Sequence, residues 1–247
     1  MRTAFIALVS LAAACSAGTS IAAQAADVAP AYPVKTKTVA ALAPSWTGFY
    51  IGPSVGWTFG SSEGDYTGIP VILPMVFYPF DLKPSGAALG GLLGYNVQSG
   101  RWLFGVEGDL SWIVNADDRI WDPAGSNRYD EIKLLWTGHA RGRVGYLFDQ
   151  YLMYFAGGAA FAGTRNAHYG PTAAPMGPGT LWSERRTRTG YSLGGGIEAA
   201  LNAQWLVRAE YLYDHFGNEF FDWVPGTRYS NSDLTLNTVR VGVVFRP

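Results

Sequence analysis

Cysteine is almost missing from this chain, and neither sign of charge dominates it. The one cysteine among the 247 residues, Cys15, lies in an apolar N-terminal run. If that run is removed as a signal peptide, the remaining protein has no thiol for a disulfide, a metal site or redox chemistry. Lysine and arginine number 18 against 19 aspartate and glutamate, so no excess of positive charge points to nucleic acid or another polyanion.

Long apolar runs are also lacking beyond the N-terminus. Residues 1–25 have a short positive start at Arg2, an apolar run and a small-residue cleavage site at Ala23-Gln24-Ala25, which predict a signal peptide. After it, no stretch approaches the ~20 apolar residues of a transmembrane helix. Charged residues nevertheless make up only 15% of the chain, whereas soluble domains average about one quarter. We therefore expect a surface that meets something other than water.

From Trp46 onward, apolar and polar residues alternate in segments of strand length. Short connections at Ser99-Gly100, Asp149-Gln150 and Asn202-Ala203 alternate with long polar ones that are rich in Gly, Pro, Asn and Asp. This asymmetry is typical of outer-membrane barrels. Eight strands are predicted, at residues 48–60, 86–98, 101–114, 132–148, 151–164, 186–201, 204–215 and 234–245. The long connections are 61–85, 115–131, 165–185 and 216–233.

The predicted fold is all-β: an eight-stranded antiparallel transmembrane β-barrel with short periplasmic turns and long extracellular loops. Three parts follow along the chain. Residues 1–25 form the signal peptide, residues 26–45 a flexible periplasmic N-terminal segment without clear periodicity, and residues 46–247 the outer-membrane barrel domain.

Residues two apart on a strand share a face, and the two faces of these strands differ sharply. Trp102 and Phe104 face one way, whereas Glu107 and Asp109 face the other. A soluble sandwich also alternates, but it spreads its aromatic residues through the core. Here the outward aromatic residues gather at both strand ends, as the headgroup regions of a bilayer favour. The group expected near the short turns is Phe49, Tyr95, Trp102, Phe104, Tyr146, Phe148, Tyr154, Trp205 and Phe245. The group expected near the long loops is Trp57, Phe59, Trp112, Trp136, Tyr191, Tyr211 and Tyr213.

Several short motifs follow one another in order along these strands. Among them are Trp46-Thr47-Gly48-Phe49-Tyr50, Gly105-Val106-Glu107-Gly108-Asp109, Arg141-Gly142-Arg143-Val144-Gly145-Tyr146 and Val239-Arg240-Val241-Gly242. Together they resemble the small outer-membrane proteins of alphaproteobacteria, called porin-family or outer-membrane immunogenic proteins, with a transmembrane barrel of the OmpA type. The resemblance covers Trp46 to Phe245. It implies a surface antigen of the Gram-negative cell outer membrane that contributes to envelope integrity and surface interaction; some relatives bind haemin.

The end of the chain departs from that family. Relatives usually finish on an aromatic residue that the barrel-assembly machinery reads, whereas here Phe245 is followed by Arg246-Pro247. Either Phe245 serves as the signal, or assembly is less efficient.

The interior of an eight-stranded barrel has room only for side chains. Strand parity sends five carboxylates and five guanidinium groups inward, and because an unpaired charge there would be costly, we expect a hydrogen-bonded network. The network either fills the barrel as a plug, which the small diameter favours, or lines a small low-conductance porin. Its candidate residues are Glu107, Asp109, Arg141, Arg143, Glu198, Arg208, Glu210 and Arg240, with Arg188 and Asp214 also directed inward.

An enzyme is not predicted. His139 is expected inside the barrel among arginines, His168 in a long loop, and His215 at a strand end facing outward. None has a serine and a carboxylate at strand spacing, as a nucleophile and its base would require. Neither a cofactor nor a metal site is expected.

Residues 65–80 are unusually apolar for a surface loop. Such segments commonly mark a ligand or partner site, although the loop could equally pack over the barrel mouth as a lid. Binding of a haemin-like surface ligand is therefore the alternative function, and its candidate residues are Tyr66, Phe77, Tyr78, His168 and His215.

The other expected partners follow from the membrane location. They are outer-membrane lipid, lipopolysaccharide and, during insertion, the barrel-assembly machinery; nucleic acid is not among them. Arg185, which faces outward at the external rim, could contact a lipopolysaccharide phosphate.

Overall fold

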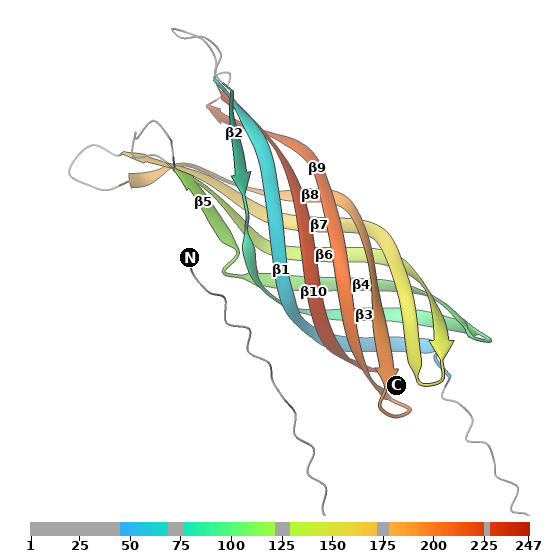
Figure 1. Ribbon diagram of the computed structural model, residues 1–247. Helices are drawn as coiled ribbons and strands as arrows, with labels where there is room; N and C mark the ends of the chain where they lie inside the picture. The colour runs from blue at the N-terminus through green and yellow to red at the C-terminus, as the bar shows by residue number, and fades with distance from the viewer. Residues whose placement is uncertain (1–44, 69–76, 122–128, 172–177, 225–227) are drawn as a thin grey trace, which may run out of the picture. The chain divides into compact units, whose positions relative to one another are not determined.

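The computed structural model describes residues 45–68, 77–121, 129–171, 178–224 and 228–247 (Figure 1). The predicted signal peptide and almost all of the N-terminal segment 26–45 lie outside these ranges. None of the described residues forms a helix long and apolar enough to cross a membrane.

The described chain consists of β-strands joined by turns and short connections. The strands are β1 (Gly48–Gly68), β2 (Phe77–Leu82), β3 (Ser85–Ser99), β4 (Trp102–Val114), β5 (Asp117–Trp121), β6 (Tyr129–Phe148), β7 (Tyr151–Pro171), β8 (Pro178–Ala200), β9 (Trp205–Val224) and β10 (Arg228–Phe245).

Eight of these strands close into an antiparallel barrel, which confirms the predicted fold. They are hydrogen-bonded in the order β10-β9-β8-β7-β6-β4-β3-β1, and β1 pairs with β10 to close the ring. At the seam, Val55 lies opposite Val241. Closure leaves no unpaired edge in the barrel wall, which is a condition for a β-structure in lipid. The short strands β2 and β5 pair with β1 and β6 outside this ring.

Three short connections mark one end of the barrel, called here the turn end; the opposite end is the loop end. The connection Asp149-Gln150 is as predicted, whereas the first turn falls at Gly100-Arg101, one residue later than expected. The third spans residues 201–204 instead of Asn202-Ala203. Gly100 and Asp149 take positive φ angles of 62° and 54°, which glycine and aspartate tolerate better than most residues.

The long connections at the loop end are built mainly as extensions of the strands. β1 runs on to Gly68, β7 to Pro171 and β9 to Val224, well past the strand ends expected from the sequence. Expecting unpaired loops there was wrong. Beyond the bilayer both faces of a strand meet water, so the apolar and polar alternation that marks a strand fades although the backbone pairing continues.

Alternation of burial confirms which face of each strand is directed outward. Phe49 and Phe155 are 68% and 76% exposed on the outer surface, whereas Glu107 and Arg141 are buried inside. Tyr154 is the exception: it was expected in the aromatic group near the short turns but is buried in the lumen. It lies between Gly145 and Gly196 on the two neighbouring strands, and the missing side chain at Gly196 leaves space for its ring.

Candidate functional site: the charged layer in the lumen

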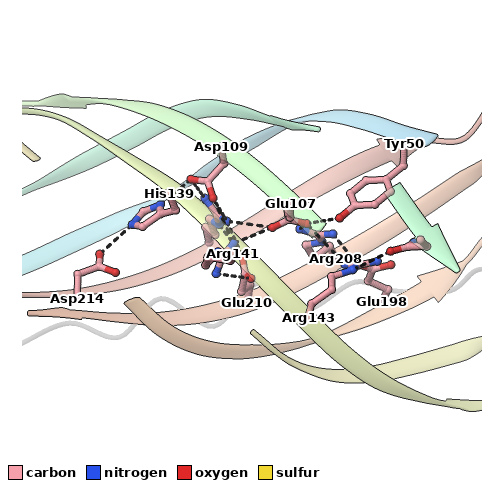
Figure 2. A network of polar contacts seen from close by, with 12 residues as sticks. Tyr50, Glu107, Asp109, His139, Arg141, Arg143, Glu198, Arg208, Glu210 and Asp214 are labelled. Atoms are coloured by element: carbon pink, nitrogen blue, oxygen red, sulfur yellow. Dashed lines mark hydrogen bonds and ion pairs between the residues drawn. The ribbon is translucent and has the colours of Figure 1, made fainter. Parts of the chain in front are cut away.

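A layer of paired charges fills the middle of the barrel. All eight residues predicted for the lumen network lie in it, and none is more than 9% exposed. Figure 2 shows the labelled members of this network pointing toward one another between the strands. Two come from each of β4, β6 and β9, and one from each of β8 and β10. We call these eight residues, together with Tyr50, His139 and Asp214, the charged layer.

Strand register places opposite charges directly across from one another. Glu107 on β4 lies opposite Arg141 on β6, and Glu198 on β8 lies opposite Arg208 on β9. Glu210 on β9 is likewise opposite Arg240 on β10. Opposite charges at facing positions stabilise strand pairing, so the network also favours the native register of these strands.

Glu107 is the most highly connected carboxylate of the layer (Figure 2). Its Oε1 accepts a hydrogen bond from Arg141 Nη2 at 2.7 Å, and its Oε2 accepts one from Arg208 Nη1 at 2.6 Å. The hydroxyl of Tyr50 donates to the same Oε2 at 2.7 Å. Charge-assisted bonds of this length are about twice as strong as neutral ones.

A second group of contacts surrounds Asp109 on the side of the layer toward the loop end. Arg240 Nη1 donates to Asp109 Oδ1 at 2.8 Å, while Arg240 Nε donates to Glu210 Oε2 at 2.7 Å. Arg141 joins this group to the first, since its Nη1 lies 3.0 Å from Glu210 Oε1. The ion pairs therefore form one connected network and not separate bridges.

Two tyrosines, Tyr50 and Tyr154, hold the arginines on the side toward the turn end. The guanidinium of Arg143 lies 4.7 Å from the ring centroid of Tyr50 and 4.9 Å from that of Tyr154, so it is held between two aromatic rings. Arg143 Nη1 also donates to Glu198 Oε1 at 2.6 Å, and its Nε donates to Asn96 Oδ1 at 3.0 Å.

Tyr50, Tyr154 and Asn96 were not among the residues predicted for the network. Parity alone could have placed Tyr50 inside, because its neighbour Phe49 faces outward. Glycine gives a second signal: Gly94 lies opposite Tyr50, and a Cβ there would overlap the tyrosine ring. A glycine across from an inward aromatic residue therefore marks where the ring lies.

His139 extends the layer toward the loop end. Its ring nitrogens lie 2.8 Å from Asp109 Oδ1 and 3.1 Å from Asp214 Oδ2, so the imidazole bridges two carboxylates. A histidine beside a carboxylate also occurs in catalytic sites, but the side chain of His139 is only 2% exposed. A substrate has no access to it in this structure.

Two apolar layers enclose the charged layer. On β4, Leu103 precedes the charged residues and Ile113 follows them; on β9, Leu206 and Phe216 do the same. The layer toward the turn end consists of Trp46, Leu92, Leu103, Leu147, Leu152, Tyr154, Ala156, Leu206 and Val244, and the ring of Tyr50 packs with it while its hydroxyl belongs to the charged layer. The layer toward the loop end consists of Ala88, Ile113, Ala116, Leu134, Ala160, Ala162, Phe216, Leu234 and Leu236.

Arg246, which follows the aromatic Phe245, packs at the turn end. Its guanidinium lies 4.7 Å from the ring centroid of Trp46, and it donates hydrogen bonds to the carbonyl oxygens of Ser45 and Ala203 at 3.1 and 3.0 Å. Phe245 pairs with Trp205 on the outer wall. The arginine thus covers the apolar layer while the phenylalanine keeps an outward position.

The five residues considered for a surface ligand are not gathered into one site. Tyr66 lies opposite Tyr78 on the β1–β2 pair, next to the position of Phe77. His168 lies on β7, opposite Asp130 and Trp182. His215 lies on the outer wall of β9, with its ring 5.3 Å from that of Tyr191. Within the described strands no pairing brings either histidine next to Tyr66. Nor do the described residues include three His, Cys, Asp or Glu side chains grouped to hold a metal ion.

Comparison with known proteins gives the same class as the geometry, a β-barrel of the outer membrane. The model of the family "Outer membrane protein beta-barrel domain" matches residues 11–246. The chain is 29% identical to the 31 kDa outer-membrane immunogenic protein of Brucella melitensis, over 91% of this chain and 93% of the relative. It is 27% identical to the 22 kDa outer membrane protein of Rhizobium leguminosarum, over 82% of this chain and 80% of the relative.

Solved structures include more distant similarities. The outer membrane protein OprG from Pseudomonas aeruginosa is 13% identical over 81% of this chain and 97% of its own, with a TM-score of 0.46. Neisserial surface protein A is 12% identical over 81% of this chain and 98% of its own, with a TM-score of 0.40.

The chain belongs to the outer membrane protein beta-barrel domain family and is a protein of the cell outer membrane. The turn end is accordingly periplasmic and the loop end extracellular. The names of the Brucella and Rhizobium relatives do not indicate an enzymatic activity.

Proposed function

We propose that this protein is a structural barrel of the outer membrane that contributes to envelope integrity and surface interaction without conducting solutes. One observation carries the proposal: the charged layer spans the lumen and an apolar layer encloses it on each side. A water-filled path would have to pass both apolar layers, whose side chains are almost completely buried. An ionic plug without access to water supports the barrel wall rather than transport.

Solute flux through vesicles tests the sealed lumen. The purified protein is reconstituted into lipid vesicles and swelling is followed in isotonic solutions of small sugars, with a general porin as the positive control. We expect no swelling above that of empty vesicles. Size-dependent swelling would instead support the low-conductance porin.

The envelope role has a separate cellular test. A strain without this protein should become more sensitive to detergents, and both the wild type and a variant with the external hairpins shortened should restore resistance. Unchanged sensitivity of the deletion strain would contradict the envelope role while leaving the sealed lumen unaffected.

Insertion by the barrel-assembly machinery is part of the same proposal, with Phe245 as the terminal aromatic signal. Phe245 remains on the outer wall beside Trp205, at a ring distance of 5.0 Å. Replacing Phe245 by alanine should lower the amount of assembled barrel, whereas the same change at Val243, two positions earlier on that face, should have less effect.

Haemin binding remains an alternative function with its own test. Haemin absorbance is titrated against the protein before and after replacement of His168 and His215 by glutamine. Binding that depends on both histidines would favour this function, although the strand pairing does not bring them together.

A further inference from the structure

Three basic residues lie side by side on the outer face of the barrel near the extracellular end. Lys133 on β6 lies opposite Arg165 on β7, and Arg165 lies opposite Arg185 on β8. We call these three residues the basic row. The neighbouring side chains Leu134 and Thr164 are buried inside, so strand alternation directs Lys133 and Arg165 outward. Arg185 is exposed, as are Ser183 and Thr187 on the same face of β8.

The basic row carries positive charge that no described side chain neutralises by an ion pair. Among the described residues, neither Lys133 nor Arg185 forms an ion pair. The side chain of Arg165 donates to two neutral groups of the described strands, the hydroxyls of Ser183 at 3.2 Å and Tyr169 at 3.0 Å. Like charges at directly opposite positions destabilise a strand pair, so three in a row need a reason outside the fold.

The carboxylates that the structure describes near the row, Glu131, Asp117 and Glu184, are each engaged by another arginine; Glu184 Oε1 accepts a hydrogen bond from Arg186 Nε at 2.6 Å. Glu131 Oε2 accepts a hydrogen bond from Arg119 Nε at 2.8 Å. Asp117, which lies opposite Lys133, has its Oδ2 at 3.5 Å from Arg119 Nη2. The local charge therefore remains positive after these pairs are counted.

The depth of the row relative to the bilayer follows from the aromatic residues below it. Toward the membrane, Trp136 is three residues from Lys133, Phe161 is four residues from Arg165, and Tyr191 is six residues from Arg185. At about 3.3 Å per residue and a strand tilt of about 40°, the row lies roughly 8–15 Å above these aromatic side chains. Aromatic residues mark the membrane interface, so the row lies at the level of the lipid headgroups or just beyond.

We propose that Lys133, Arg165 and Arg185 bind the phosphate groups of lipopolysaccharide, the phosphorylated lipid of the outer leaflet. Arg165 supplies a planar donor fixed by Ser183 and Tyr169, and Lys133 and Arg185 add charge on either side. A phosphate placed across the row removes the repulsion between the three cations. The site adds a lipid contact to the proposed envelope role and does not depend on whether the lumen conducts.

The test compares two double variants of the full-length folded protein. Lys133→Gln/Arg185→Gln removes two charges of the row and leaves Arg165 with its hydrogen bonds. The matched control, Lys83→Gln/Arg101→Gln, removes two exposed charges elsewhere on the barrel. Lys83 is paired at 2.7 Å with Asp81, and its hydrogen bond lowers the pKa of that carboxyl; Arg101 lies in the first periplasmic turn.

The measured quantity is affinity for diphosphoryl lipid A in detergent micelles, by native mass spectrometry. Each basic side chain near an anionic lipid surface contributes about a fivefold increase in affinity, so the row variant should bind roughly 25-fold more weakly. The control should stay within about twofold of the wild type, and fully dephosphorylated lipid A should not distinguish the three proteins.

Equal losses in both variants would overturn the proposal, since they would show unspecific attraction. Equal affinity of the wild type for phosphorylated and dephosphorylated lipid A would overturn it too. Displacement of the lipid by low concentrations of inorganic phosphate would also contradict the proposal, because it would show that the basic row binds a free anion and not the lipid. Electrophoretic mobility without heating verifies folding, and Lys133→Arg/Arg185→Lys, which keeps both charges, should retain wild-type binding.

Discussion

Replacing Glu107 by glutamine tests how much the charged layer contributes to stability. The change keeps the size of the side chain but removes the charge that Arg141 and Arg208 contact at 2.7 and 2.6 Å. A hydrogen bond to a charged group contributes about 1.5–3 kcal/mol, so two such bonds give about 3–6 kcal/mol. Removing one partner of a buried ion pair costs about 3–5 kcal/mol because it leaves the other charge buried without a partner. We therefore expect Glu107→Gln to lower the free energy of unfolding by about 3–5 kcal/mol.

Urea unfolding in lipid vesicles, followed by tryptophan fluorescence, measures this change. Glu63→Gln is the matched control because Glu63 is exposed on β1, and it should stay within about 0.5 kcal/mol of the wild type. The double variant Glu107→Gln/Arg208→Gln should lose less than the sum of the single variants, since each removes a partner of the other; a coupling of about 0.5–3 kcal/mol is expected. A loss below about 1 kcal/mol for Glu107→Gln, or strictly additive losses, would refute the reasoning.

Two further predictions concern the packing around the charged layer. Tyr50→Phe should lower the free energy of unfolding by about 1.5–3 kcal/mol because it removes the bond to Glu107, whereas Tyr154→Phe should be neutral or stabilising, since the buried Tyr154 hydroxyl has no hydrogen-bond partner in the described structure. Equal effects in the same unfolding assay would contradict the assignment. Gly94→Ala should cost about 1–3 kcal/mol because its Cβ would overlap the Tyr50 ring and the Val106 carbonyl oxygen. Gly91→Ala, whose Cβ would meet the Gly52 carbonyl oxygen at 3.6 Å, should leave stability almost unchanged. Similar losses of stability in both variants would show that the overlap with the Tyr50 ring at Gly94 is not the cause of the loss.

The barrel could be predicted from the sequence because the membrane enforces a strong contrast between the two faces of each strand. Outward residues such as Trp102 and Phe104 meet lipid, while inward residues such as Glu107 and Asp109 must pair inside a narrow lumen. Period-two alternation was therefore sufficient to find eight strands and the eight charged residues that meet in the lumen.

The pairing partners inside the network could not be predicted. Which carboxylate meets which arginine depends on strand register, and the third turn, expected at Asn202-Ala203, spans residues 201–204 and shifts the pairing of β8 with β9 by one residue. A shift of that size changes every pair across these two strands, and the pair of Glu198 with Arg208 is one of them.

The difference in polarity between the two faces of a strand was too small to predict two other features. Tyr154 lies in a strand where small residues such as Ala156 and Ala159 blur the difference between the faces, so its inward position was missed. The external extensions of β7 and β8 meet water on both sides, and their alternation does not separate strand from loop. Arg165 and Arg185 of the basic row lie in these extensions, and they come together with Lys133 only through the register of three strands.

Single-channel recording on the folded protein in a planar lipid bilayer tests the central claim, that the lumen is sealed, most directly. Folding is verified beforehand by the shift in electrophoretic mobility on heating. The charged layer and its two apolar layers predict a current that remains at the baseline of the bare bilayer at modest voltages of either sign. Steady, reproducible openings that disappear when the protein is denatured would contradict the sealed lumen.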